Sequence, residues 1–251
     1  MLDVMKGIMQ AMKDNSALQL AVITGCLRIA KESIFTGTNN FVSDTITSSR
    51  LNEYFGFTQA EVDQLLQDTS LTDHAEDVKA WYDGYHFGEF DIYCPWDVMN
   101  YLQDLQFDPS KKPISYWKNT SDNAIIRSFI DYSGPSISKK LELLLSGGYI
   151  VQTIEEDLTY DYLHSSEDNL WSILYLTGYL TRVREIPPSD GSIALMIPNA
   201  EVKEIFRSTI QKWFKDSSQT WNRQAMFQAL WAGDSETLTK EIGKLLRKTI
   251  S

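Results

Sequence analysis

The feature that most constrains the fold is a short, almost uninterrupted apolar run near the start of the chain, Ala17-Leu-Gln-Leu-Ala-Val-Ile-Thr24. A run without polar alternation is typical of a β-strand buried on both faces, and such strands usually lie inside parallel sheets. The run needs neighbouring strands, but the later segments with strand character are half-buried ones such as residues 41–47. The sequence therefore predicts that the chain begins partway through a larger α/β domain.

Helical signals dominate the next part of the chain. Thr58 and Glu61 match a capping box, in which each side chain bonds the other residue's backbone amide, so a helix is predicted over residues 59–67. Pro95 suits the first position of another helix, and its predicted buried face consists of Val98, Tyr101, Leu102 and Leu105. Apolar periodicity predicts two further helices, over residues 2–14 and 121–131.

From Ser136 the order of predicted elements changes. The patterns indicate a helix, a strand, a helix, a β-hairpin and a helix, over residues 139–145, 149–154, 169–176, 179–197 and 198–213. This order is typical of a winged helix, with a Pro/Gly-rich hairpin tip at residues 187–191. Two more helices are predicted near residues 224–231 and 236–248. The fold class expected from these patterns is α+β, mainly α-helical.

Composition excludes several classes of protein. The 251 residues include 34 acidic and 23 basic ones, a net charge of −11, and the 43% of apolar residues support a packed core rather than a disordered chain. No apolar run approaches the roughly 20 residues of a membrane helix. Two cysteines, Cys26 and Cys94, and three scattered histidines match neither a disulfide scaffold nor a zinc signature. We expect a reduced, cytoplasmic protein.

The negative charge is concentrated in one stretch. Residues 58–108 contain 12 acidic residues and one basic residue, Lys79, whereas residues 199–251 contain 9 basic and 6 acidic ones. The acidic stretch should repel nucleic acids and anionic membrane surfaces, but the interpretation that we favour is an ordinary solvated face.

Several longer stretches resemble a known family. They are residues 24–40, Tyr54-Phe-Gly-Phe-Thr58, Trp81-Tyr-Asp-Gly-Tyr-His-Phe-Gly88, Ile92-Tyr-Cys-Pro-Trp96, Tyr116-Trp-Lys-Asn-Thr-Ser121, residues 170–180 and Ile197-Pro-Asn-Ala-Glu-Val202. Together they resemble the bacterial AAA-ATPase-like family, predicted P-loop ATPases often fused to a C-terminal PD-(D/E)XK nuclease-like domain. The likeness covers nearly the whole chain to about residue 215.

The resemblance implies a division of the chain. Residues 1–50 would be a C-terminal remnant of the P-loop ATPase core, 51–135 a helical lid region, 136–215 a winged-helix domain and 216–251 helices leading toward a missing nuclease-like domain. Members of the family bind ATP and Mg²⁺ through a phosphate-binding loop upstream of the segment that matches Thr24. Nothing in this chain matches G-x-x-x-x-G-K-[ST], so no cofactor is expected for it alone.

Two groups of residues are candidates for contact with a nucleotide in the parent family. Similarity places Thr24, Arg28 and Lys31 near a sensor of the γ-phosphate, because they follow the buried strand. The alternative is that Arg28 and Lys31 pair with nearby carboxylates such as Glu32.

The second group is the corner formed by Tyr93, Pro95 and Trp96, which resembles a proline-containing turn that touches adenine in related ATPases. The alternative, which we favour, is an ordinary helix start with Trp96 in the core. Likewise Trp81-Tyr-Asp-Gly-Tyr85 is either a recognition patch or, more simply, the core of an aromatic hairpin with its turn at Asp83-Gly84.

Two tempting functions are rejected from the sequence. Asp190 followed by Glu201-Val-Lys203 mimics a nuclease motif, but Glu201 and Lys203 should lie in the first turn of a helix and Asp190 in a turn, so they would not converge on a metal. The helix expected near residues 166–175 has two acidic residues and no Arg or Lys, which is unlike a helix that reads DNA.

We therefore expect a non-catalytic portion of an AAA-ATPase-like protein, made of a sensor strand, a lid and a winged helix. The alternative is a stand-alone protein-interaction module that uses the aromatic region 81–96 or the wing. The expected partner is another protein or a second copy of the chain, with no specific nucleic acid and no membrane.

Overall fold

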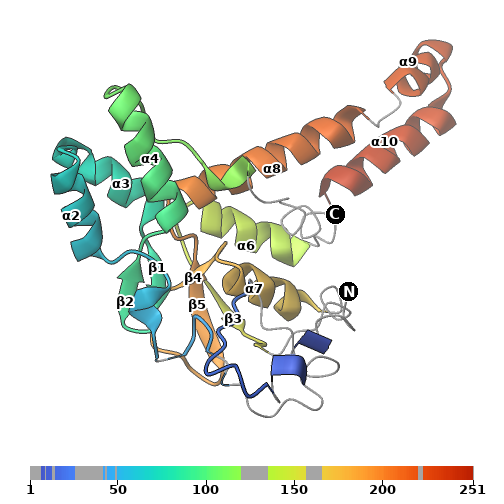
Figure 1. The fold of residues 1–251 in the computed structure, drawn as a ribbon. Helices are drawn as coiled ribbons and strands as arrows, with labels where there is room; N and C mark the ends of the chain where they lie inside the picture. The colour runs from blue at the N-terminus through green and yellow to red at the C-terminus, as the bar shows by residue number, and fades with distance from the viewer. Residues whose placement is uncertain are drawn as a thin grey trace.

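The computed structural model describes residues 7–8, 10–12, 15–25, 42, 44–48, 50–119, 135–156, 166–219 and 223–250. It confirms a mixed α+β protein in which helices predominate and the sheets are small (Figure 1). The predicted helix 121–131 lies outside the described residues. Of the predicted helix 2–14, the described positions 7–8 and 10–12 are helical.

The first region contains three α-helices, two short 3-10 helices and a β-hairpin. It comprises the short helices η1 (Asn52–Tyr54) and η2 (Thr72–His74), helices α2 (Gln59–Asp68), α3 (Ala75–Tyr82) and α4 (Pro95–Phe107), and strands β1 (Tyr85–Phe87) and β2 (Phe90–Ile92). The capping box is confirmed, because the Thr58 side chain accepts from the Glu61 amide and the Glu61 carboxylate accepts from the Thr58 amide at 2.8 Å. The predicted buried face of α4 is also confirmed.

The second region has the element order that the sequence predicts. A short helix η3 (Trp117–Asn119) precedes it, followed by α6 (Pro135–Leu145), β3 (Ile150–Thr153), α7 (Glu167–Leu176), β4 (Thr181–Arg182), β5 (Ser192–Met196) and α8 (Ala200–Gln219). The three strands form an antiparallel sheet in the order β3-β5-β4. The hairpin tip lies where it was expected, at Asp190 and Gly191, both with positive φ.

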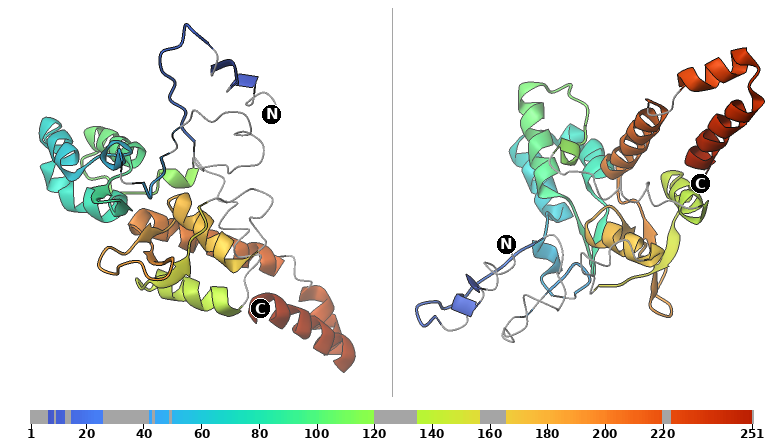
Figure 2. Two further views of the ribbon diagram at one scale, coloured as in Figure 1. Left: turned by 90° about the horizontal axis from the view of Figure 1, so that it is seen from below. Right: turned by 90° about the vertical axis from the view of Figure 1, so that its right-hand side faces the viewer.

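The last two helices, α9 (Arg223–Ala232) and α10 (Ser235–Ile250), also match their predicted positions. They lie side by side at the far end of α8, which extends away from the sheet (Figures 1 and 2).

Among the described residues there are two hydrophobic cores, and one of them crosses the boundary predicted at residue 135. The larger core combines residues of α6, α7, α8 and the three-stranded sheet with Tyr85 and Ile92 of the β1–β2 hairpin. The smaller core lies among α2, α3 and α4. The hairpin therefore belongs to the packing of the second region although it precedes that region in the chain.

The prediction of a strand over residues 17–24 is wrong for this structure. Residues 15–25 have no strand, and the side chains of Leu20 and Val22 are 78% and 80% exposed. The segment stands clear of the helices and sheets in both views (Figure 2). A strand requires inter-strand hydrogen bonds, and no strand of the described residues pairs with this run. The predicted strand 41–47 is also not found, because the described residues 44–48 form a turn in which the Ser48 amide bonds the Thr45 carbonyl at 2.9 Å.

Candidate functional site

The structure places one of the three predicted sensor residues. Thr24 lies in the exposed segment 15–25, and Arg28 and Lys31 lie outside the described residues. A role in sensing the γ-phosphate therefore stays a prediction for all three.

The predicted adenine corner divides into a buried and an exposed part. Tyr93 is 1% exposed, and its hydroxyl donates to Gln59 Oε1 at 2.7 Å, so its ring has no face open to a ligand in solution. Pro95 occupies the first position of α4, as predicted. The expectation that Trp96 lies in the core is wrong, because this side chain is 55% exposed. The buried face of α4 begins with Asp97 and Val98, which turns Trp96 toward solvent.

The aromatic run 81–85 has a structural role in both regions. Tyr82 is buried and its hydroxyl donates to the Ile114 carbonyl at 3.0 Å, while Tyr85 enters the larger core. These positions agree with the core interpretation. The predicted turn is misplaced, however: Asp83-Gly84 joins α3 to β1, and the hairpin turns between Phe87 and Phe90 instead.

The Asp83-Gly84 turn contacts the start of α8 closely. Asn199 Nδ2 donates to the Asp83 carbonyl at 2.8 Å, and Asn199 Oδ1 accepts from the Val202 amide at 3.0 Å, so one side chain both caps α8 and binds the turn. Gly84 has φ 99°, and a Cβ at this position would lie 2.2 Å from the Pro198 carbonyl oxygen. The turn thus requires glycine both for its conformation and for its contact with residue 198.

Polar contacts continue along the same junction from β1 to β4. The His86 amide donates to Thr181 Oγ1 at 2.9 Å, and the His86 ring is hydrogen-bonded to Asp91. Asp91 also forms an ion pair with Arg184 at 2.9 Å. These contacts connect the β1–β2 hairpin to the region of strand β4.

A cavity of about 200 Å³ lies beside this hairpin junction. Its polar lining includes the side chains of His86, Tyr175, Arg182 and Glu156, and its apolar lining includes Ile154. Arg182 Nη2 donates to the Gly88 carbonyl at 3.4 Å, so this cation is already used to hold the hairpin. The volume could accommodate a small polar molecule.

The junction also contains a buried pair of carboxyl groups, Asp97 and Glu201, which no sequence pattern predicted. Asp97 in the first turn of α4 and Glu201 in the first turn of α8 are both fully buried. Burial is the main cause that raises the pKa of Glu201 to about 8, and the neighbouring Asp97 raises it further. Burial also raises the pKa of Asp97. An acidic residue in a first helical turn is normally interpreted as an exposed partner of the helix dipole, so no sequence signal pointed to burial.

Asp190, Glu201 and Lys203 occupy the kinds of element that the sequence predicted when a nuclease site was rejected. Glu201 and Lys203 lie in α8 rather than on a strand, and Asp190 lies at the hairpin tip. Among the residues that the structure describes, no group of three or more His, Cys, Asp or Glu side chains could hold a metal ion.

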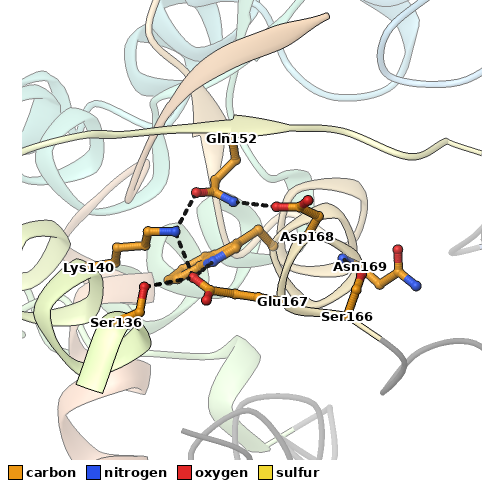
Figure 3. A network of polar contacts seen from close by, with 8 residues as sticks. Ser136, Lys140, Gln152, Ser166, Glu167, Asp168 and Asn169 are labelled. Atoms are coloured by element: carbon orange, nitrogen blue, oxygen red, sulfur yellow. Dashed lines mark hydrogen bonds and ion pairs between the residues drawn. The ribbon is translucent and has the colours of Figure 1, made fainter. Parts of the chain in front are cut away.

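A second polar cluster ties α6, β3 and α7 together (Figure 3). Lys140 Nζ donates to Glu167 Oε1 at 2.6 Å and to Gln152 Oε1 at 2.7 Å, and Gln152 Nε2 donates to Asp168 Oδ1 at 3.0 Å. Burial would raise the pKa of Glu167, but hydrogen bonds from Lys140 and Trp171 outweigh it and hold this pKa below its usual value. The acidic residues of α7 are thus engaged in holding the helix on the sheet.

Comparison with known proteins adds one relative. No protein-family model matches the chain, and no solved structure matches it. The chain is 24% identical over 208 residues to a protein of Azotobacter chroococcum mcd 1 described as "Uncharacterized protein in vnfD 5'region". The match covers 80% of this chain and 36% of the relative, so the chain spans little more than a third of the relative's length. In the described part of the chain, no helix has the length and apolar character needed to cross a membrane.

Proposed function

We propose that this chain is a non-catalytic, protein-binding region of an AAA-ATPase-like protein, made of a sensor segment, a helical lid and a winged-helix-like unit. Its partner is the parallel sheet of a nucleotide-binding unit, to which residues 17–24 add a strand. ATP and Mg²⁺ would be bound by that unit. The two cysteines and the acidic composition support a cytoplasmic location.

The observation that carries the proposal is the exposure of the apolar run. Leu18, Leu20, Val22 and Ile23 are all exposed large apolar side chains. Burying one such side chain contributes about 1.5–3 kcal/mol, so a partner that covers the run would gain substantial binding energy. Because apolar residues occupy both faces of the run, the partner that fits is the interior of a sheet rather than a single flat surface.

Two further observations support the same proposal. The order of α6, β3, α7, the β4–β5 hairpin and α8 is the order expected of a winged helix. The relative from Azotobacter is much longer than this chain, which leaves room in a related protein for a nucleotide-binding unit.

A second candidate function is protein recognition by the surface of α4, and exposure of Trp96 favours it. Trp96 and Met99 are one helical turn apart and are 55% and 48% exposed. Exposed Trp and Met side chains are enriched where proteins bind one another. This candidate uses the aromatic region that the sequence analysis singled out.

The experiment compares the self-association of three forms of the full chain, since a second copy is the available partner for strand pairing when the sheet is absent. Light scattering is measured over increasing concentration for the wild type, Val22→Lys and the matched control Val42→Lys, whose residue is 77% exposed but lies outside the run. We expect the wild type and the control to associate and Val22→Lys to stay monomeric. A wild type that stays monomeric throughout, or a Val22→Lys variant that associates like the wild type, would contradict the strand-pairing proposal.

Calorimetry with Mg-ATP tests the non-catalytic part of the proposal. We expect no binding and no phosphate release, because hydrolysis needs the γ-phosphate held by backbone amides, a lysine and Mg²⁺ together. Micromolar binding that is lost on Arg28→Ala would show that the chain has a nucleotide site of its own, and this part of the proposal would fail.

A further inference from the structure

Two buried carboxyl groups meet where the first turns of α4 and α8 come together. Asp97 and Glu201 are each 0% exposed, and they come from helices that begin more than 100 residues apart in the chain. The two carboxyl groups interact, because, besides the larger effect of burial, Asp97 raises the pKa of Glu201 and Glu201 lowers that of Asp97. Glu201 Oε1 accepts from the Trp117 amide at 2.9 Å. Neither oxygen of Asp97 nor Oε2 of Glu201 has a donor at normal hydrogen-bond geometry, although the Cys94 thiol interacts with Asp97 and acts to lower the pKa that burial raises.

The surroundings of the pair contain weak acids rather than cations. The groups that interact with the pair are the Tyr82 hydroxyl of α3, the Tyr85 hydroxyl of β1, the Cys94 thiol that precedes α4, the Tyr116 hydroxyl and the Ser115 hydroxyl. Within the described ranges, no Lys, Arg or His forms an ion pair with either carboxyl group. Two neighbouring buried negative charges without a cation would be strongly unfavourable.

The helix ends explain why one charge can persist there. Each carboxyl group lies in the first turn of its helix, where unpaired backbone amides and the helix dipole favour negative charge. The two helix ends thus stabilise one negative charge on the pair. A proton held between the two carboxyl groups gives their unpaired oxygens the hydrogen-bond donor that they otherwise lack. When two adjacent carboxyl groups cannot both be ionised, one of them keeps its proton and its pKa is raised.

We propose that Asp97 and Glu201 share one proton across the junction of α4 and α8, and that this proton holds the two regions together, so that the junction loosens as pH rises. The inference is independent of the function proposed above, because it concerns only how the lid-like helices are held on the winged-helix-like unit. Its chemistry is a single acid–base step: above the transition, hydroxide removes the shared proton and leaves two facing carboxylates.

The direction of the pH effect follows from the shift of Glu201. Its pKa is raised from 4.5 to about 8, so the folded chain binds a proton that the unfolded chain has released. The contribution of the pair to stability is full below about pH 4.5, falls as pH rises, and is lost above about pH 8.

The experiment measures urea unfolding of the full chain from acid to alkaline pH for the wild type, Glu201→Gln and Glu204→Gln. The glutamine side chain of Glu201→Gln keeps the shape of the original one and cannot lose a proton, while Glu204 is an exposed acidic residue of the same helix and is the matched control. Between pH 5 and pH 8.5, we expect the unfolding constant of the wild type to rise on the order of several hundredfold relative to that of Glu201→Gln. Glu204→Gln should follow the wild type.

A second measurement does not depend on the variants. The Trp117 amide donates to Glu201, so its amide resonance should titrate with the pair, with a midpoint near pH 8, in the folded wild type. A Trp117 amide that does not shift between pH 5 and pH 9, or a wild type whose pH profile matches that of Glu201→Gln, would overturn the proposal. Stabilisation of the wild type by Mg²⁺ or Ca²⁺ that Glu201→Gln lacks would also overturn it, because a metal ion would then neutralise the pair.

Discussion

The side-chain amide of Asn199 donates to the carbonyl oxygen of Asp83 at 2.8 Å, although the two residues are 116 positions apart. This hydrogen bond connects the end of α3 with the N-cap of α8. The next residue after Asp83, Gly84, lies in close contact with the Pro198 carbonyl group. The two regions are therefore joined at this point by a hydrogen bond from a side chain to the backbone and by a contact that leaves no room for a Cβ at residue 84.

Gly84→Ala should destabilise the protein strongly. The new Cβ would lie 2.2 Å from the Pro198 carbonyl oxygen, and the backbone at φ 99° is strained for alanine. We expect a loss of about 3 kcal/mol or more in the free energy of unfolding, measured by urea denaturation. Gly147→Ala is the control, because Gly147 has a similar φ of 93° with nothing within 4 Å of its Cβ position. Its cost should be only about 1 kcal/mol, and equal losses in the two variants would show that the contact with Pro198 contributes nothing.

Lys140→Met should reduce stability at neutral pH and lose this effect in acid. Lys140 holds the pKa of Glu167 below its usual value against the opposing effect of burial. The Glu167 carboxylate therefore contributes stability above its unfolded pKa, near 4.5, and this contribution disappears as pH falls through the lower folded value. Because both side chains are about one-third exposed, we expect a cost of only about 1 kcal/mol at pH 7.

The control for Lys140→Met is Lys139→Met, which removes an exposed lysine from the neighbouring position of α6. Thermal unfolding of both variants and the wild type across the acid range provides the comparison. A Lys140→Met defect that persists unchanged below the titration of Glu167 would mean that lost packing on Trp171, rather than the ion pair, causes it.

Trp96→Ala should leave stability almost unchanged, whereas Trp171→Ala should cost much. Trp96 is 55% exposed and Trp171 is fully buried in the larger core. We expect a change within about 0.5 kcal/mol for Trp96→Ala and a loss of about 3–5 kcal/mol for Trp171→Ala. Acrylamide quenching of tryptophan fluorescence should decrease in Trp96→Ala, because this exposed ring is accessible to the quencher. A large loss of stability in Trp96→Ala would show that this side chain packs against part of the protein after all.

Elements whose signals are local could be predicted from the sequence. The capping box of Thr58 and Glu61, Pro95 at the first position of α4 and the glycine stop after α6 each depend on residues within one or two turns of each other. The order of elements from α6 to α8 could be predicted for the same reason, since alternation and helical periodicity are properties of short windows. Strands β3 and β4 are shorter than predicted, because pairing with a neighbouring strand rather than the apolar pattern limits their length.

The tertiary structure alone decided which polar and apolar groups are covered. Residues 17–24 have the composition of a buried strand but remain exposed, because a strand forms only where another strand supplies its hydrogen bonds. Trp96 is exposed while Asp97, the next residue, is fully buried, because Asp97 meets Glu201 from the distant helix α8. The sequence by itself thus determined the local elements and their order. The buried carboxyl pair and the junction around it depend on contacts between residues about 100 positions apart, so no local pattern encodes them.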